Sequence, residues 1–171
     1  AHRGPDGRGE YAAQDVAFAH TRLSIIDLET GDQPHDDGAR VALIANAEIY
    51  NFVELRAQHA DLEFATASDC ELPLRLYPSA GADVARELRG MYALALHDRR
   101  ENSLLLARDP FGIKPLYYGC SGSTFLFGSE LKRLAIHPHW KGEINRNALT
   151  LYMRYNYVPT PWSIYQGIHK L

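Results

Sequence analysis

Residues Met91–His97, which read MYALALH, decide the predicted fold. In an extended chain successive side chains point to opposite faces, so the large residues at even positions share one face and the Met and Ala residues share the other. Neither face is polar before His97, and we therefore expect a strand that is covered on both sides. Small residues let another layer approach closely, while the bulky face suits a sheet or a helix layer. The stretch predicts a layered α+β fold.

Short apolar runs on both sides of this stretch predict further strands. They lie at 16–19, 23–26, 41–45, 104–107, 116–118 and 125–127. The connections 98–102 and 121–123 are short, whereas a parallel crossover needs a dozen or more residues. We therefore expect antiparallel pairing.

Capping residues predict helices between and after these strands. Asn51 with Glu54, and Ser68 with Glu71, have the spacing of a capping box. The helix after Ser68 is expected to end before Pro78. Further helices are expected at 83–89 before Gly90, at 130–136 after Ser129 and at 146–155 after Asn145.

The last predicted helix carries an apolar stripe that is expected to lie in the core. The stripe consists of Ala148, Leu149, Tyr152 and Met153. The tail 156–171 shows no period and no strand that can be paired, so we expect the start of a linker there.

Composition excludes several classes of protein. The 171 residues carry 18 Lys and Arg against 21 Asp and Glu, a net charge of -3, so a nucleic-acid surface is not expected. No apolar run approaches the ~18 residues of a membrane span, and the polar amino terminus lacks a signal sequence. Cys70 and Cys120 have neither disulfide-framework nor zinc spacing, which favours a reducing cytoplasm. We expect a soluble cytoplasmic protein with a small partner and no metal.

Three polar residues could act on a small molecule. Arg22 presents a planar fork suited to a carboxylate, or makes an ordinary surface salt bridge. Asn46 could donate to a developing oxyanion together with the next backbone N–H, or it makes a turn. Asp69 could hold an ammonium group, or it complements a helix dipole. Cys70 has no adjacent histidine, so a nucleophilic role is not expected.

Seven ordered segments resemble the glutaminase domain of glutamine-dependent asparagine synthetases, which are class II amidotransferases of the N-terminal nucleophile type. They are HRGPDG at 2–7, TRLSIIDLETGDQP at 21–34, NAEIYNFVELR at 46–56, SDCE at 68–71, LRGMYALALHDRR at 88–100, ARDPFGIKPLYY at 107–118 and FGSELKRL at 127–134. The tail resembles the segment that leads into the family's ATP-using synthetase domain. The resemblance implies a glutaminase domain at 1–155, incomplete at its amino terminus, and a linker at 156–171.

The resemblance also implies a fold and a site. The fold would be an αββα sandwich of two antiparallel sheets without its first strand. L-glutamine would be the substrate, with Arg22 on its α-carboxylate, Asp69 on its α-ammonium, and Asn46 with the N–H of Ala47 as the oxyanion hole. Glu48 would lie beside the substrate, and the backbone of Leu23, Ser24, Ile25 and Ile26 would line the pocket. This domain would need no cofactor, while ATP and magnesium would serve the partner synthetase domain; the family also allows a homodimer.

Two departures from the family pattern affect the expected activity. The family nucleophile is an amino-terminal cysteine, whereas this sequence begins at Ala1, so the chain is expected to be truncated and inactive as printed. Ala47 stands where the family usually has Gly, and a positive φ there would cost roughly 1 kcal/mol or more. Two alternatives therefore stay open: a non-catalytic scaffold, as in β-lactam synthetase relatives, and a glutamine sensor without turnover.

Overall fold

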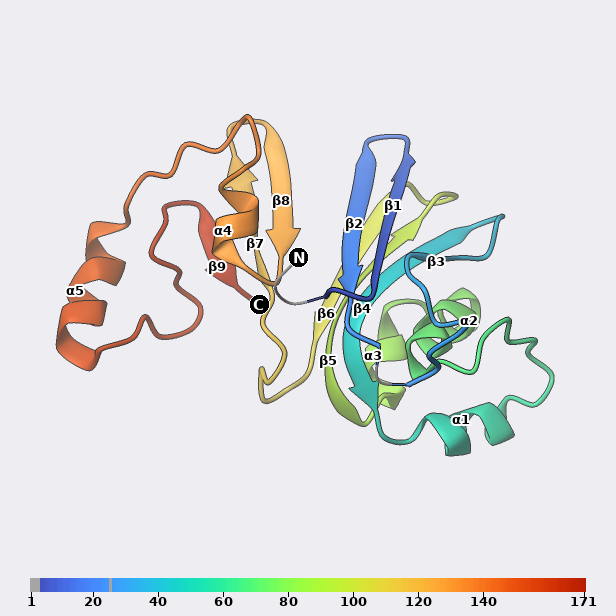
Figure 1. The fold of residues 1–171 in the computed structure, drawn as a ribbon. Helices are drawn as coiled ribbons and strands as arrows, with labels where there is room; N and C mark the ends of the chain where they lie inside the picture. The colour runs from blue at the N-terminus through green and yellow to red at the C-terminus, as the bar shows by residue number, and fades with distance from the viewer. Residues whose placement is uncertain (1–3, 25) are drawn as a thin grey trace. The chain divides into compact units, whose positions relative to one another are not determined.

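The computed structural model describes residues 4–24 and 26–171, and the chain divides into two compact units, Ala1–Asp109 and Pro110–Leu171 (Figure 1). The first unit contains a four-stranded antiparallel sheet with the order β3-β4-β5-β6. Its strands are β3 (His35–Asp36), β4 (Val41–Ile49), β5 (Gly90–Asp98) and β6 (Ser103–Arg108). Residues 92–98 of β5 are all buried, so the prediction that both faces of this strand are covered is confirmed.

Helices cover one face of this sheet (Figure 1). They are α1 (Phe52–Gln58), α2 (Leu72–Ala80) and α3 (Val84–Glu87), with the short 3-10 helices Asp69–Glu71 and Gly81–Asp83 beside α2. The core between the two layers includes Leu43 and Ile49 from β4, Leu94 and Leu96 from β5, and Leu74 from α2. Odd-numbered residues of β4 therefore face the helices, and even-numbered residues face the opposite side.

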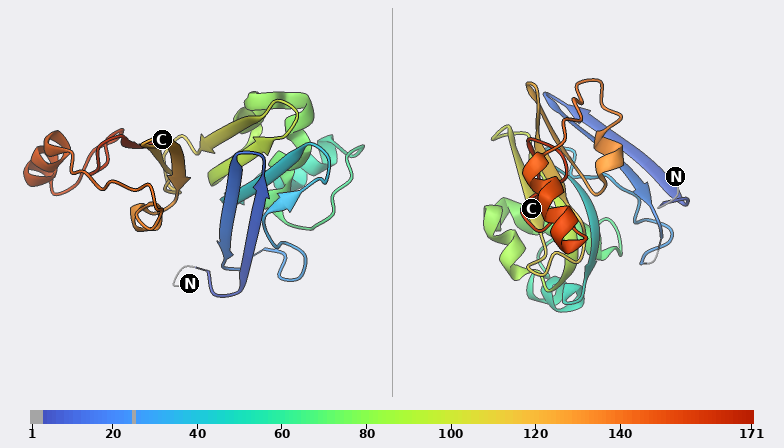
Figure 2. Two further views of the ribbon diagram at one scale, coloured as in Figure 1. Left: turned by 90° about the horizontal axis from the view of Figure 1, so that it is seen from above. Right: turned by 90° about the vertical axis from the view of Figure 1, so that its left-hand side faces the viewer.

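A β-hairpin covers that opposite side. β1 (Gly7–Ala13) pairs antiparallel with β2 (Val16–Arg22), and the hydroxyl of Tyr11 forms a 2.8 Å hydrogen bond with Nδ1 of His97 on β5. In Figure 2 the blue hairpin and the green helices lie on opposite sides of the sheet. The first unit thus has a helix layer, a sheet and a second sheet, which confirms the layered α+β prediction.

The second unit is built on a three-stranded antiparallel sheet with the order β8-β7-β9. Its elements are β7 (Tyr117–Ser121), β8 (Thr124–Gly128), α4 (Leu131–Leu134), α5 (Arg146–Tyr155) and β9 (Ile168–Lys170). The bounds predicted for α5 are confirmed, because the side chain of Asn145 accepts hydrogen bonds from the N–H groups of Asn147 and Ala148. The prediction that the tail pairs with no strand is wrong, since β9 pairs with β7.

Tertiary contacts override several local predictions. Among the described residues of 23–26 there is no strand, because the chain turns there and lies against Arg22. Asn51 does not cap α1; its side-chain amide instead donates to the carbonyl of Glu87 and accepts from the N–H of Arg89. Strand β1 was not predicted, because GRGEYAA is polar and rich in turn-forming residues.

Further helix boundaries also differ from the predictions. Pro78 lies inside α2, where the burial of apolar neighbours outweighs the loss of one backbone hydrogen bond. Helix α3 is only four residues long, and Gly90 begins β5 instead of capping that helix. Helix α4 starts after Glu130 and not after Ser129.

The stripe on α5 is not a core stripe in the second unit. Of its four members only Ala148 is buried, and Met153 is 75% exposed. A periodic pattern identifies an amphipathic helix correctly, but it does not say which part of the stripe finds a partner.

We expect Gly9→Ala to destabilise the first unit by about 1–3 kcal/mol, the usual range for overpacking. A Cβ at position 9 would lie 1.9 Å from the carbonyl oxygen of Gln33 and 2.7 Å from Cδ of Pro34, so the backbone would have to move. Urea unfolding followed by circular dichroism measures this change. Arg8→Ala, at an exposed position of the same strand, is the control; equal midpoints for both variants would contradict the close approach.

Candidate functional site

The candidate site lies at one edge of β4, where strand β3 stops early. β3 pairs only with Ala42 and Leu43, whereas β4 continues to Ile49. A strand edge without a partner leaves N–H and C=O groups that must be satisfied in another way. The groups that satisfy this edge define the site.

The hydrogen-bond pattern of β5 shows which groups of β4 point to this edge. The N–H of Asp109 donates to the carbonyl of Tyr92 at 2.8 Å, so the backbone of Tyr92 is directed toward β6. Ala47 is paired in register with Tyr92 and is therefore a non-hydrogen-bonded partner of β5. The N–H and C=O groups of Ala45, Ala47 and Ile49 consequently point away from β5, to the open edge.

Side chains take the place of a neighbouring strand along this edge. Oε1 of Gln33 accepts from the N–H of Ala45 at 2.7 Å, and Nε2 of Gln33 donates to the Ala45 carbonyl at 3.0 Å. At the other end, Oδ2 of Asp69 accepts from the N–H of Ile49 at 2.7 Å. Between them, Sγ of Cys70 lies 3.9 Å from the carbonyl of Ala47. No described residue accepts a hydrogen bond from the N–H of Ala47, so this edge presents one open donor.

Ala47 has ordinary strand geometry. It lies within β4 and is not among the described residues with positive φ. The strain expected for a Cβ at this position depended on a positive φ, and that condition is not met here. The methyl group packs against the core on the helix side, which leaves the N–H in the plane of the sheet.

Asn46 and Arg22 face the same space between the two sheets. Asn46 is an even-numbered residue of β4 and so faces the hairpin. Phe18 and Arg22 are the buried residues of β2, which places them on the inner face of the hairpin. Glu48 shares the hairpin side of β4 with Asn46.

Arg22 holds the loop that follows it. Its Nη1 lies 3.0 Å from Oδ1 of Asp32, a side chain that is 77% exposed, and its Nη2 donates to the carbonyls of Ile26 and Asp27. The Asp27 carboxylate accepts at 2.9 Å from the N–H of Ala67, two residues before Asp69. Contacts therefore connect Arg22 through one loop to the segment that carries Asp69.

The remaining predicted pocket residues differ in their exposure and hydrogen bonds. Leu23 is 57% exposed, and the N–H of Ser24 donates to Oδ2 of Asp6 at 2.9 Å. Ile26 is partly buried and contributes its carbonyl to Arg22. Ile25 lies outside the described residues.

Reasoning from the sequence missed Gln33, His20 and His35. Gln33 is 8% exposed, although it lies between Asp32 and Pro34 in a stretch that resembles a turn. Burial lowers the pKa of both His20 and His35, and one ring nitrogen of each, Nδ1 and Nε2 respectively, is buried without a hydrogen-bond partner among the described residues. The period of β2 was the available signal for His20, since it shares the inner face with Phe18 and Arg22.

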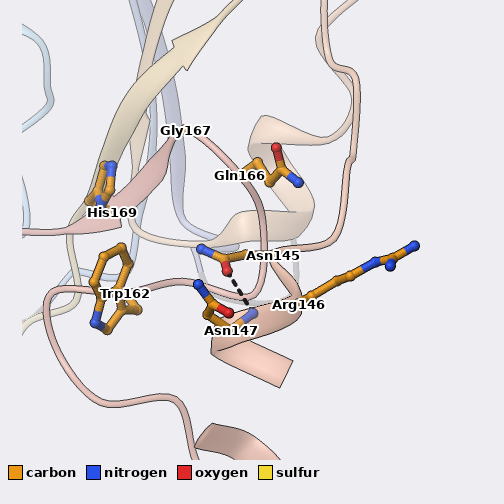
Figure 3. Close-up of a pocket in the computed structure, with 7 residues that line it drawn as sticks. All are labelled: Asn145, Arg146, Asn147, Trp162, Gln166, Gly167 and His169. Carbon is orange, nitrogen blue, oxygen red and sulfur yellow. Dashed lines mark hydrogen bonds between the residues drawn. The ribbon is translucent and has the colours of Figure 1, made fainter. Parts of the chain in front are cut away.

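Within the part of the chain that the structure describes, no group of three or more His, Cys, Asp and Glu side chains could hold a metal ion. None of its helices has the length and apolar character needed to cross a bilayer. A surface depression of about 400 Å³ lies in the second unit and contains none of the predicted site residues. Figure 3 shows its lining, in which Arg146 extends away from Trp162 and His169.

We expect acidification from pH 7 to pH 5 to destabilise the first unit through the two buried histidines. Their pKa values are lowered from 6.5, so the unfolded chain binds more protons, and stability falls as the pH drops below about 6.5, by at most about 1.4 kcal/mol per pH unit for each histidine. Carboxyl groups with lowered pKa values, such as Asp98 and Glu71, make stability fall only at lower pH, below their ordinary pKa values of 3.8 and 4.5.

Urea unfolding at a series of pH values measures this slope. His35→Gln and His20→Gln should each reduce it, because each removes a histidine whose pKa is lowered. A slope that is the same in both variants and in the parent would contradict the assignment.

Comparison with known proteins identifies the family of the chain. The family model for a glutamine amidotransferase domain matches residues 1–171. A putative glutamine-hydrolysing asparagine synthetase of Methanocaldococcus jannaschii is 36% identical over 99% of this chain and 37% of its own length. Asparagine synthetase B of Escherichia coli is 43% identical over 78% of this chain and 24% of its own length. The chain thus spans well under half the length of these curated relatives.

Solved structures support the same relationship. The glutamine phosphoribosylpyrophosphate amidotransferase of B. subtilis superposes with a TM-score of 0.58 and 26% identity, over 70% of this chain and 29% of that one. An allosteric regulatory enzyme of purine biosynthesis gives a TM-score of 0.56 at 26% identity, over 67% and 28% of the two chains. With antiparallel sheets, an α+β fold of the N-terminal nucleophile type and a family match over its whole length, the chain belongs to the glutamine amidotransferase domain family.

Proposed function

We propose that this chain is the glutamine-binding portion of an asparagine synthetase and that it takes part in the release of ammonia from L-glutamine. The observation that carries the proposal is the open N–H of Ala47 on the β4 edge, next to Asn46 and between Gln33 and Asp69. The names of the curated relatives describe glutamine-hydrolysing asparagine synthetases, which supports this assignment.

Recognition of the amino acid would use two opposite charges. The guanidinium of Arg22 has five N–H donors, and its hydrogen bonds to Asp32, Ile26 and Asp27 leave donors for an α-carboxylate. Asp69 uses Oδ2 for the Ile49 N–H, so Oδ1 can accept from an α-ammonium group. Asp69 is 2% exposed, and a carboxylate in such a position needs a cationic partner.

The reaction would place the substrate carbonyl at the β4 edge. A thiolate forms a bond to the amide carbon, the carbonyl electrons move to oxygen, and the oxyanion accepts from the Asn46 side chain and the Ala47 N–H. The oxyanion electrons then re-form the carbonyl bond while the C–N bond breaks, and the leaving nitrogen takes the proton that the thiol released, which yields ammonia and a thioester. Water hydrolyses the thioester to glutamate.

Neither cysteine of the chain suits the nucleophile's role. Burial, reinforced by the charge of Asp69, raises the pKa of the Cys70 thiol to about 12, so it stays protonated near neutral pH. Cys120 is exposed on β7, in the second unit. We therefore propose that these 171 residues bind glutamine and hydrolyse it only when a thiol is supplied from elsewhere in the protein.

The released ammonia would serve an ATP-dependent amidation of aspartate in a synthetase domain, where ATP and magnesium would bind. That domain would be the main protein partner in the cytoplasm, and a homodimer is a further proposed assembly. The glutaminase portion itself would need no cofactor.

A second candidate function is glutamine binding without turnover, as a sensor or a scaffold. Cys70 favours it, because burial raises the pKa of this thiol to about 12 and so disfavours the thiolate that turnover needs. Saturable binding of glutamine together with no glutamate formed by the protein as its gene encodes it would establish this second function. Steady glutamate production by that protein would exclude it.

We expect L-glutamine to bind this chain in isothermal titration calorimetry, and Arg22→Lys to weaken binding about tenfold to hundredfold. A charge-assisted hydrogen bond contributes roughly 1.5–3 kcal/mol, and lysine has three donors instead of five, so it cannot keep the contacts to Ile26 and Asp27 and also bind the carboxylate as arginine does. Asp32→Asn is the matched control because it removes the same salt bridge. It should keep or raise affinity, since it removes a competing carboxylate. Equal losses in both variants would show that Arg22 is only structural.

We also expect Asp69→Asn to lower the affinity for glutamine about tenfold or more while the fold is retained. The amide oxygen can still accept from the Ile49 N–H, so the substitution removes the charge and keeps the edge contact. Calorimetry with L-glutamine, and with glutaramate as a ligand that keeps the amide and lacks the ammonium group, measures the effect. Unchanged glutamine affinity would remove Asp69 from the ammonium site.

A further inference from the structure

Gln33 replaces a missing strand beside the proposed oxyanion hole. Its side-chain amide makes both hydrogen bonds that a peptide group would make to Ala45, at 2.7 and 3.0 Å. The backbone cannot do this itself, because β3 begins only at His35 and Pro34 has no N–H.

The position of the Gln33 side chain is tightly restricted. The residue is almost fully buried, and its carbonyl lies so close to β1 that a Cβ at Gly9 would be 1.9 Å away. The hairpin therefore leaves the 33–34 backbone no room to move away from the β4 edge. The side-chain amide of Gln33 is therefore held in place, and it forms the two hydrogen bonds to Ala45 that a neighbouring strand would form.

Ala47 lies between two such fixed points. Gln33 fixes the backbone of Ala45, and Asp69 fixes the N–H of Ile49, each two residues or about 7 Å away along the strand. An oxyanion donor is effective only when it lies about 2.7–3.1 Å from the place where charge develops. The direction of the Ala47 N–H therefore depends on both anchors.

We infer that Gln33 is a positioning residue that aims the Ala47 N–H and the Asn46 side chain at the substrate carbonyl. Gln33 does not touch the substrate; it acts through the backbone of Ala45. The inference deepens the proposed function and rests on it, because it assigns Gln33 to the same oxyanion hole.

Asn51, just after β4, supplies a matched control. Its side-chain amide also makes two backbone hydrogen bonds, from Nδ2 to the Glu87 carbonyl at 2.9 Å and to Oδ1 from the Arg89 N–H at 2.8 Å. It bonds the last residue of α3 and the residue before β5, away from the open edge. Gln33→Met and Asn51→Leu each remove one such amide while approximately keeping its shape.

The first experiment measures glutaminase kinetics and unfolding of the protein as its gene encodes it. Gln33→Met should lower kcat about tenfold to hundredfold, the effect of a donor misplaced by about 1 Å, with KM for glutamine within about threefold. Asn51→Leu should lose similar stability and keep its kcat. Equal kcat values in the two variants would overturn the inference.

Gln33→Glu supplies a second test that does not depend on how well Gln33→Met folds. A protonated carboxyl group has one donor and one acceptor, as the amide does, whereas a carboxylate would face the Ala45 carbonyl without a proton. The kcat of Gln33→Glu relative to the parent should therefore rise as the pH falls from 8 to 6. Both proteins share the charged and titratable groups around this position, which are His20 against the Ala45 backbone, His35, Arg22, Asp32, Glu71 and Arg75. A ratio that is constant with pH would count against the positioning role.

The amide resonance of Ala47 separates this inference from the proposed function. In a proton–nitrogen correlation spectrum its position should change in Gln33→Met and stay the same in Asn51→Leu. If the parent protein releases no glutamate, the proposed function fails, and the spectrum still decides whether Gln33 controls the Ala47 N–H. If the parent is active and the Ala47 resonance does not change in Gln33→Met, the positioning role fails alone.

Discussion

The requirement that a buried strand edge satisfy its backbone groups governs this structure. β3 pairs with only two residues of β4, so the edge of β4 from Ala45 to Ile49 depends on side chains for its hydrogen bonds. Gln33 and Asp69 satisfy the two ends, and no acceptor from the described part of the chain meets the N–H of Ala47 between them. An unsatisfied donor is costly in a protein interior, and such a group at a site edge is typical of a place prepared for a ligand.

The layers around β4 bring the chemistry to this edge from different parts of the chain. The helix side supplies Asp69 and Cys70 from a short 3-10 helix whose start is fixed by Ser68. The hairpin side supplies Arg22. Gly9 of the same hairpin lies in close contact with the carbonyl of Gln33. The residues proposed to bind glutamine and those proposed to form the oxyanion hole would therefore depend on the same hairpin. A change in hairpin packing would then alter both binding and catalysis.

The Asp69 side chain is bonded to the β4 backbone and would also be able to bind a ligand. One carboxylate oxygen fixes Ile49, and the other remains able to accept from an ammonium group. Arg22 is similar, because it fixes the 26–27 carbonyls while donors remain for a carboxylate. The site is thus pre-organised by the residues that would bind the substrate, which reduces the ordering needed on binding.

The sequence by itself determined the layered α+β class, the antiparallel pairing of β5 with β6 and of β7 with β8, and the start of α5 after Asn145. These features follow from side-chain period, short connections and a local cap, all of which act between near neighbours. The motifs around Arg22, Asn46 and Asp69 also identified the family. Only the tertiary structure decided that Ala47 is extended, that Asn51 bonds Glu87 and Arg89 instead of capping α1, and that Gln33 satisfies the β4 edge at Ala45. Each of these depends on where β3 stops and where the hairpin lies, and contacts between distant segments leave no periodic signal in the sequence.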